Sequence, residues 1–207
     1  MWAGEEPMMI VDDTGRANQK KRTRMAIVEA CREVIRSGSP LTMPEVARVA
    51  LVSEATAYRY FPDLPALLSY AFPGLWPAPA EALAPVADST DPVGRVAFAC
   101  GFLLRGVLAY QGAVRAMIAA TITRPELAVT RPGLRFGLID EALAPLSSTL
   151  MVADPAGLAQ LKDDLAAVIS AEALFVLTDL AGLPPDDAIA SLIRTATTIT
   201  AAALQQA

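Results

Sequence analysis

The chain has 207 residues, a hydrophobic content of 54%, a mean hydropathy of +0.40 and a formal net charge of −5. It has no histidine, no metal-ligand spacing and no glycine-rich phosphate loop, so we expect neither an enzyme nor a protein that holds a metal or another cofactor. Alanine and leucine dominate and no alternating strand pattern is found, which predicts an all-α fold.

Positive charge is concentrated near the start of the chain. Residues 14–61 contain nine Lys and Arg against four Glu, a net charge of +5, which leaves −10 for the rest of the chain. Phosphate binding requires such a local excess, and the acidic remainder would be repelled from nucleic acid.

Residues 1–22 have no helical periodicity and end in a basic run, so we expect a flexible N-terminal arm. Two roles stay open for the basic residues from Lys20 to Arg24: contact with an adjacent DNA groove, or the solvated start of a helix. From Thr23 to Ser37 an amphipathic helix is predicted, and Gly38 ends it. Its apolar stripe consists of Ile27, Val28, Cys31, Val34 and Ile35.

The stretch Thr42–Phe61 predicts two short helices joined by a tight turn. Thr42 and Glu45 have the spacing of a capping box, in which each side chain bonds the other residue's amide. Ser53 has the position of the cap of the second helix, Glu54–Phe61. Apolar residues at 46, 47, 50, 52, 57 and 61 predict one shared core, which leaves Glu54, Ala55, Thr56, Tyr58 and Arg59 on the outer face.

At these residues the chain resembles the tetracycline-repressor (TetR) family of bacterial transcription regulators. The resemblance is carried by Val46-Ala47, Val52-Ser53, Thr56 and Tyr58-Arg59-Tyr60-Phe61. It implies a helix-turn-helix that binds a double-stranded DNA operator, a C-terminal domain for a small-molecule effector, and a homodimer. Two positions depart from the family pattern: Leu51 stands where the turn usually has Gly, and Leu64 where a Lys is usual. A non-Gly residue at positive φ costs about 1–2 kcal/mol.

The second helix of this motif suits the major groove of DNA, which is wide enough to admit a helix. We expect Glu54, Thr56 and Arg59 to read bases, because they lie early or outward on that helix. Contacts to phosphate are expected from Thr42, Ser53, Tyr58 and Tyr60.

A fourth helix is predicted from Leu64 to Phe72, which would close a DNA-binding domain over residues 23–72. A ligand-binding and dimerisation domain would follow over residues 73–207. Residues 73–92 contain five prolines and predict a loop with one short turn around 81–84. Trp76 in this loop is expected to cover the core, with contact to a ligand as the alternative. The uncharged run 64–80 contains four prolines, so no membrane-spanning segment is expected.

Three helices are predicted next, over about 92–110, 112–122 and 132–150. Asp91-Pro92 is a strong helix start. Aromatic and apolar residues on these helices and the next predict an effector pocket with one polar anchor, although core packing is the alternative for each of them. The proposed lining is Phe98, Phe102, Arg105, Met117, Phe136 and Phe175.

The last two helices are predicted over about 154–181 and 184–206. The first is apolar on more than one side from Leu165 onward, which favours a four-helix interface between two copies of the chain. In the alternative, both helices complete the core of a monomer. We therefore expect a cytoplasmic homodimeric repressor that leaves its operator when a small molecule binds. The competing hypothesis is a helical protein that binds small molecules or other partners and has lost DNA binding.

Overall fold

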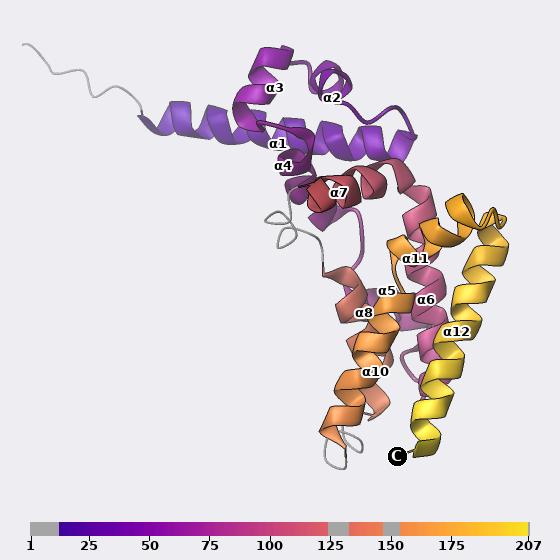
Figure 1. The fold of residues 1–207 in the computed structure, drawn as a ribbon. Helices are drawn as coiled ribbons and strands as arrows, with labels where there is room; N and C mark the ends of the chain where they lie inside the picture. The colour runs from indigo at the N-terminus through magenta and orange to yellow at the C-terminus, as the bar shows by residue number, and fades with distance from the viewer. Residues whose placement is uncertain (1–12, 124–132, 147–153, 207) are drawn as a thin grey trace, which may run out of the picture.

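The computed structural model of the protein describes residues 13–123, 133–146 and 154–206, and in these ranges its regular structure is entirely helical, as predicted. A long first helix crosses one end of the molecule, and several helices extend away from it toward the C-terminus (Figure 1). The buried side chains form two hydrophobic clusters, one around the first helix and one within the extending helices.

The N-terminal lobe is built from four helices, which are α1 (Asp13–Ser37), α2 (Met43–Val49), α3 (Glu54–Tyr60) and α4 (Leu64–Ala71). The prediction of a helix start at Thr23 was wrong, because α1 begins at Asp13. Residues 16–22 are exposed, so they carry no apolar stripe that periodicity could detect, yet Arg, Lys, Gln and Ala are good helix formers. The arm expected over residues 1–22 is therefore helical from Asp13 onward, and residues 1–12 lie outside the described residues.

One guanidinium ties α1 to the end of α4. Arg32 donates from Nε to the carbonyl of Ala71 at 2.9 Å and from Nη2 to the carbonyl of Tyr70 at 3.2 Å. These are among the last carbonyls of α4, which have no partner within the helix. A Cβ at Gly74 would lie 2.6 Å from the Arg32 guanidinium carbon, so the glycine leaves room for this contact.

The C-terminal lobe is organised around α6, which packs against α12 and α8. The expected loop over residues 73–92 contains three short helical turns, η1, α5 and η2. The elements of this part of the chain are η1 (Phe72–Gly74), α5 (Pro79–Ala82), η2 (Ala84–Val86), α6 (Pro92–Ala109), α7 (Gln111–Thr123), α8 (Leu134–Ala142), η4 (Ala144–Leu146), α10 (Pro155–Val168), α11 (Ala171–Phe175), η5 (Val176–Leu180, a π-helical turn) and α12 (Pro185–Gln206). Two α7 residues, Ala113 and Met117, belong to the N-terminal cluster. A boundary at residue 72 therefore does not separate the two cores.

Two of the predicted helices are shorter than expected. The helix predicted over 132–150 is α8, which ends at Ala142 and is followed by the 3-10 turn η4. The helix predicted over 154–181 is broken at Ile169 and Ser170 into α10 and α11. The Ser170 hydroxyl accepts the Ala173 amide at 3.1 Å and thereby starts a new helix, which the prediction of one continuous helix did not include.

The two cysteines are buried free thiols. Cys31 lies in the N-terminal cluster and Cys100 in the C-terminal one. Burial raises the pKa of each thiol to about 12, so neither has a reactive thiolate near neutral pH.

Of the described helices, α6 alone is long and apolar enough to cross a membrane, by length and composition. Core residues Val96, Cys100 and Leu104 are buried along it, and it packs between α12 and α8. This is the position of a central core helix.

Candidate nucleic-acid interface and apolar pocket

The start of α2 is held by half of the predicted capping box. The Thr42 hydroxyl accepts the Glu45 amide at 3.3 Å. The predicted return bond from the Glu45 carboxylate was wrong, because that carboxylate binds Arg48 through Nε at 2.8 Å and Nη2 at 2.7 Å. The hydrogen bonds from Arg48 are also the main cause of the lowered pKa of Glu45. The Thr42 side chain therefore caps α2, and because Thr42 is exposed it remains accessible to a ligand.

The turn between α2 and α3 is a Schellman motif. The Val52 amide donates to the Ala47 carbonyl at 3.0 Å and the Leu51 amide to the Arg48 carbonyl at 3.2 Å. Leu51 has a φ of 55°, the left-handed conformation that this position requires and that Gly adopts without strain. This chain therefore forms the Schellman turn with a leucine at the position where glycine would avoid the strain.

Replacing Leu51 with Gly is expected to raise the free energy of unfolding by about 0.5–1 kcal/mol. The relief of left-handed strain, about 1–2 kcal/mol, exceeds the entropy that Gly adds to the unfolded chain. No packing is lost because the Leu51 side chain is 92% exposed. Urea unfolding checks this, with Leu51→Ala as the control, because Ala keeps the Cβ and hence the strain. Equal stability of the Gly and Ala variants would contradict it.

Helix α3 begins at the predicted cap. The Ser53 hydroxyl accepts the Thr56 amide at 3.2 Å and donates to the Thr56 hydroxyl at 2.9 Å. Ala57 and Phe61 are buried beneath α3, as expected. The cap, the Schellman turn and these two core residues fix the orientation of α3 relative to α1.

The predicted DNA-contacting residues of α3 differ in exposure, and Arg59 lines the same groove as Thr56 and Tyr60. Glu54, Tyr58 and Arg59 are exposed, as predicted. Thr56 and Tyr60 are half-buried and face the N-terminal part of α1 together with Ser53. The Arg59 guanidinium lies 5.8 Å from the centre of the Tyr60 ring.

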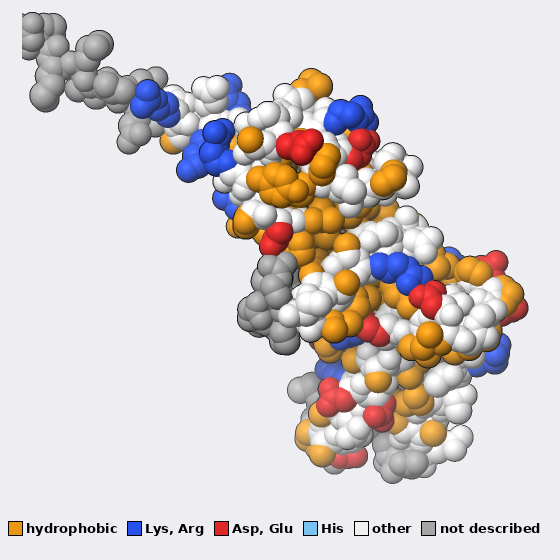
Figure 2. Space-filling model, turned by 45° about the horizontal axis from the view of Figure 1, so that its top comes forward, with side chains coloured by type: hydrophobic (Ala, Val, Ile, Leu, Met, Phe, Trp, Pro, Cys, Tyr) orange, Lys and Arg blue, Asp and Glu red, His pale blue; other side chains and the backbone are white. Residues whose placement is uncertain are grey.

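A groove of about 620 Å³ separates α3 from the beginning of α1. Lys and Arg side chains gather on this part of α1, at the same end of the molecule as α3 (Figure 2). The groove is lined by Arg16, Gln19, Lys20, Thr23, Val52, Ser53, Thr56, Arg59 and Tyr60.

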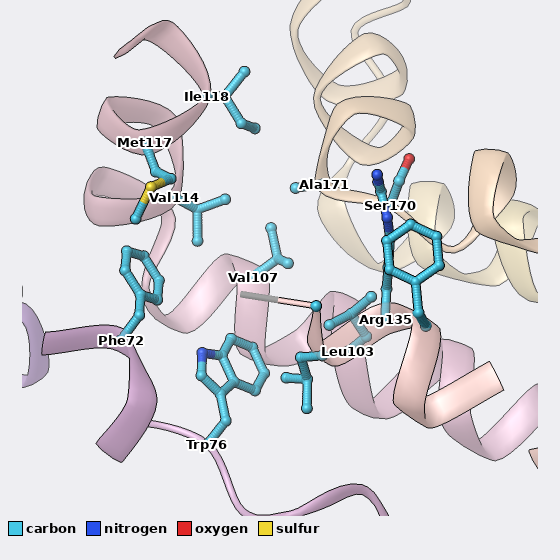
Figure 3. Close-up of a pocket in the computed structure, with 13 residues that line it drawn as sticks. Phe72, Trp76, Leu103, Val107, Val114, Met117, Ile118, Arg135, Ser170 and Ala171 are labelled. Atoms are coloured by element: carbon cyan, nitrogen blue, oxygen red, sulfur yellow. The ribbon is translucent and has the colours of Figure 1, made fainter. Parts of the chain in front are cut away.

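An apolar pocket of about 290 Å³ lies where the two lobes meet. In Figure 3, Phe72 and Trp76 lie on one side of it with Met117 of α7, and Arg135 and Ser170 lie at the opposite end. The residues that line it are Phe72, Trp76, Leu103, Val107, Val114, Met117, Ile118, Gly133, Leu134, Arg135, Phe136, Ser170 and Ala171.

Only part of the predicted pocket lining reaches this cavity. Met117 and Phe136 line it. The other four predicted residues do not line this cavity and lie in other parts of the molecule. Phe98 packs on the C-terminal core, Phe102 packs edge to face on Trp76, Arg105 is exposed, and Phe175 lies under the Arg115 guanidinium.

Sequence reasoning missed two aromatic walls of the pocket. Phe72 follows α4 directly, and Trp76 packs against Gly106 of α6, where a Cβ would lie 2.1 Å from the indole. A glycine inside an otherwise apolar helix is the signal that could have revealed this close approach. Trp76 also packs edge to face on Tyr110, the C-cap residue of α6.

The polar groups of the pocket are few and lie at its edge. Arg135 approaches the Glu172 carboxylate at 3.5 Å, and its guanidinium carbon lies 4.9 Å from the centre of the Phe136 ring. The Ser170 hydroxyl donates to the Ala167 carbonyl at 2.9 Å, so its proton is already used. The cavity therefore suits a mostly apolar molecule, with one guanidinium near its rim.

In comparisons with known proteins, no family model matches this chain, and neither a curated protein nor a solved structure matches it significantly.

Proposed function

We propose that the protein is a homodimeric, sequence-specific DNA-binding transcription regulator, of the repressor type, that a small apolar molecule releases from its operator. The single observation that carries the proposal is the orientation of α3, which is held by Ser53 and by the Schellman turn beside a groove lined by cations. The resemblance of residues 42–61 to the TetR family supports the same assignment.

On this proposal α3 enters the major groove of DNA. Its exposed side chains include a guanidinium at Arg59 and a carboxylate at Glu54, and these groups suit guanine and cytosine edges respectively. Thr42, Ser53 and Tyr58 would contact the phosphates on either side. The excess of positive charge over residues 14–61 would supply the nonspecific part of the affinity.

The apolar pocket is the proposed effector site. Its walls come from both hydrophobic clusters, Phe72 and Met117 from the N-terminal one and Leu103 and Val107 from the C-terminal one. A bound molecule would therefore contact the end of α4 and α6 together. It can change the orientation of the DNA-binding helices to the extent that it binds one arrangement of these walls more tightly than another.

A second copy of the chain is proposed to pack on the region of the last two helices. The apolar stripe of α12 packs inside this chain and is not free to contact a second copy, since Ile189, Leu192 and Ala196 are buried. The large apolar side chains that remain exposed in this region are Val176 and Leu180 of the π-helical turn. Dimeric helix-turn-helix proteins bind two half-sites one DNA turn, about 34–36 Å, or a multiple of it apart, and we propose the same for this dimer. We propose a cytoplasmic location, as befits such a regulator.

Selection from a pool of random DNA duplexes tests the proposed function. The purified protein should enrich a sequence with two related half-sites, and a mobility shift should show that the enriched duplex binds. Failure to enrich any sequence, combined with binding of an apolar ligand, would favour the competing assignment as a helical ligand-binding protein.

The pocket is testable through Trp76. In a Trp2→Phe background, the apolar fluorophore anilinonaphthalene sulfonate should quench Trp76 emission saturably, because the indole lines the cavity. Val107→Phe fills the pocket and should weaken this binding about tenfold or more. Leu51→Phe adds the same ring at a position that is 92% exposed and does not line the pocket, so it should leave this binding unchanged. Equal affinities in the two variants would place the fluorophore elsewhere.

A further inference from the structure

The beginning of α1 presents one face to α3 across the cationic groove. Arg16, Gln19, Lys20 and Thr23 are spaced at i, i+3, i+4 and i+7, which places them on the same side of a helix. Lys21 and Arg22 belong to the same two helical turns but do not line the groove.

Within the described part of the chain, the cations in the groove have no ion-pair partner. Arg16 and Lys20 of α1 and Arg59 of α3 line it, and no carboxylate does. None of the three forms an ion pair with a residue that the structure describes. By contrast, Arg32, Arg36 and Arg48 of the same lobe are paired with Glu side chains.

Core packing does not explain the first ten residues of α1. Side chains 16–22 are exposed, and the buried stripe of the helix begins only at Ile27. In Figure 1 this part of α1 projects past α3. The extension therefore places charge beside α3 and adds no apolar contact to the core.

We propose that this groove binds the phosphodiester backbone beside the base pairs that α3 would read, so that the α1 extension is a second DNA-contacting element. The inference rests on the proposed function and deepens it. Arg16 and Lys20 are one helical turn apart, about 6 Å along the axis. One DNA strand carries a phosphate about every 3.4 Å of its axis, so each of the two side chains has a phosphate of its own within reach. Hydroxyls of Ser53 and Thr56 lie on the opposite wall.

Two double variants with equal charge test this proposal. Arg16→Ala with Lys20→Ala removes the groove cations of α1, and Lys21→Ala with Arg22→Ala removes the same charge from its other faces. Alanine favours the helix in all four places. The equilibrium Kd of the full chain for its enriched duplex is measured from about 50 to 300 mM NaCl. The groove variant should lose about tenfold in affinity at 100 mM salt, and its slope of log K against log salt should be shallower by about 1.8, or 0.9 for each lost phosphate contact.

The matched variant should retain the wild-type slope and lose less than about threefold in affinity, because only the long-range field has changed. Equal losses from both pairs, with normal binding by the wild type, would overturn the groove proposal alone. A wild type that binds no duplex would instead overturn the proposed function. Inorganic phosphate at constant ionic strength separates the two sources of the anion. If inorganic phosphate binds the wild type equally well with and without a saturating amount of the duplex, the groove is a site for a free anion and the proposal is wrong.

Discussion

Replacing Arg95 with Met should lower the free energy of unfolding by about 3–5 kcal/mol, the largest loss we expect from a single substitution in this chain. Arg95 lies on α6 and is only 3% exposed. Methionine retains most of the apolar stem, so the variant isolates the contribution of the guanidinium. A loss of this size is a large share of the 5–15 kcal/mol that is typical of folded domains.

The size of the effect follows from the partners of Arg95. Nη1 donates to the carbonyls of Val86 and Ala87, at 2.6 and 3.0 Å, and Nη2 and Nε donate to those of Glu141 and Ala142, at 2.6 and 3.1 Å. The side chain therefore joins α6 to the turn η2 and to the last carbonyls of α8. Its removal leaves four carbonyls without this donor, and a buried acceptor without a partner costs about 1–3 kcal/mol.

Arg105→Met is the matched control, since it removes the same charge from an exposed position of the same helix. It should change the stability by no more than about 0.5 kcal/mol. Urea unfolding followed by circular dichroism measures both variants. A similar stability of Arg95→Met and the wild type would mean that the four contacts of Arg95 contribute little.

Replacing Arg59 with Ala should cost about 1–3 kcal/mol of binding to the enriched duplex and relax the sequence preference at one position of each half-site. Arg59 is the exposed cation of α3, and an arginine there can donate two hydrogen bonds to guanine. The loss should be smaller on duplexes that already carry a different base pair at that position, because the contact is then absent in the wild type.

Lys21→Ala is the control for Arg59→Ala, as it removes a cation that faces neither α3 nor the groove. It should weaken binding slightly and by the same factor on every sequence. Competition among duplexes with single base-pair changes gives the measurement. Uniform losses from both variants would assign Arg59 to phosphate contact and leave base reading to another residue.

The starts of α3, α6 and α10 could be predicted from the sequence because each of these starts depends on a few local hydrogen bonds. Ser53 caps α3, Asp91 accepts the amides of Val93 and Gly94 at the start of α6, and Asp154 accepts the amide of Gly157 in α10. The buried face of the helix-turn-helix was predicted for the same reason, since 3.6-residue periodicity determines which side of a short helix faces its neighbour.

The features that were missed depend on interactions that local patterns do not encode. The first turns of α1 have no apolar stripe, so no hydrophobic periodicity in the sequence indicated that they are helical. Predicting the pocket lining requires knowing which side of α6 faces the cavity, and α6 is apolar on most sides. Phe102 therefore looked as suitable for the pocket as Leu103, although only Leu103 faces the cavity. The guanidinium at the pocket belongs to Arg135, whereas the predicted anchor Arg105 points to solvent.

The most direct test of the DNA-reading assignment is the equilibrium Kd for two duplexes of equal length and composition, one with the enriched sequence and one with that sequence shuffled, between about 50 and 200 mM salt. We expect the enriched duplex to bind at least about 10³-fold more tightly, with both affinities falling steeply as salt rises. Equal affinities for the two duplexes, or affinities that do not change with salt, would contradict the assignment of α3 as a reader of DNA.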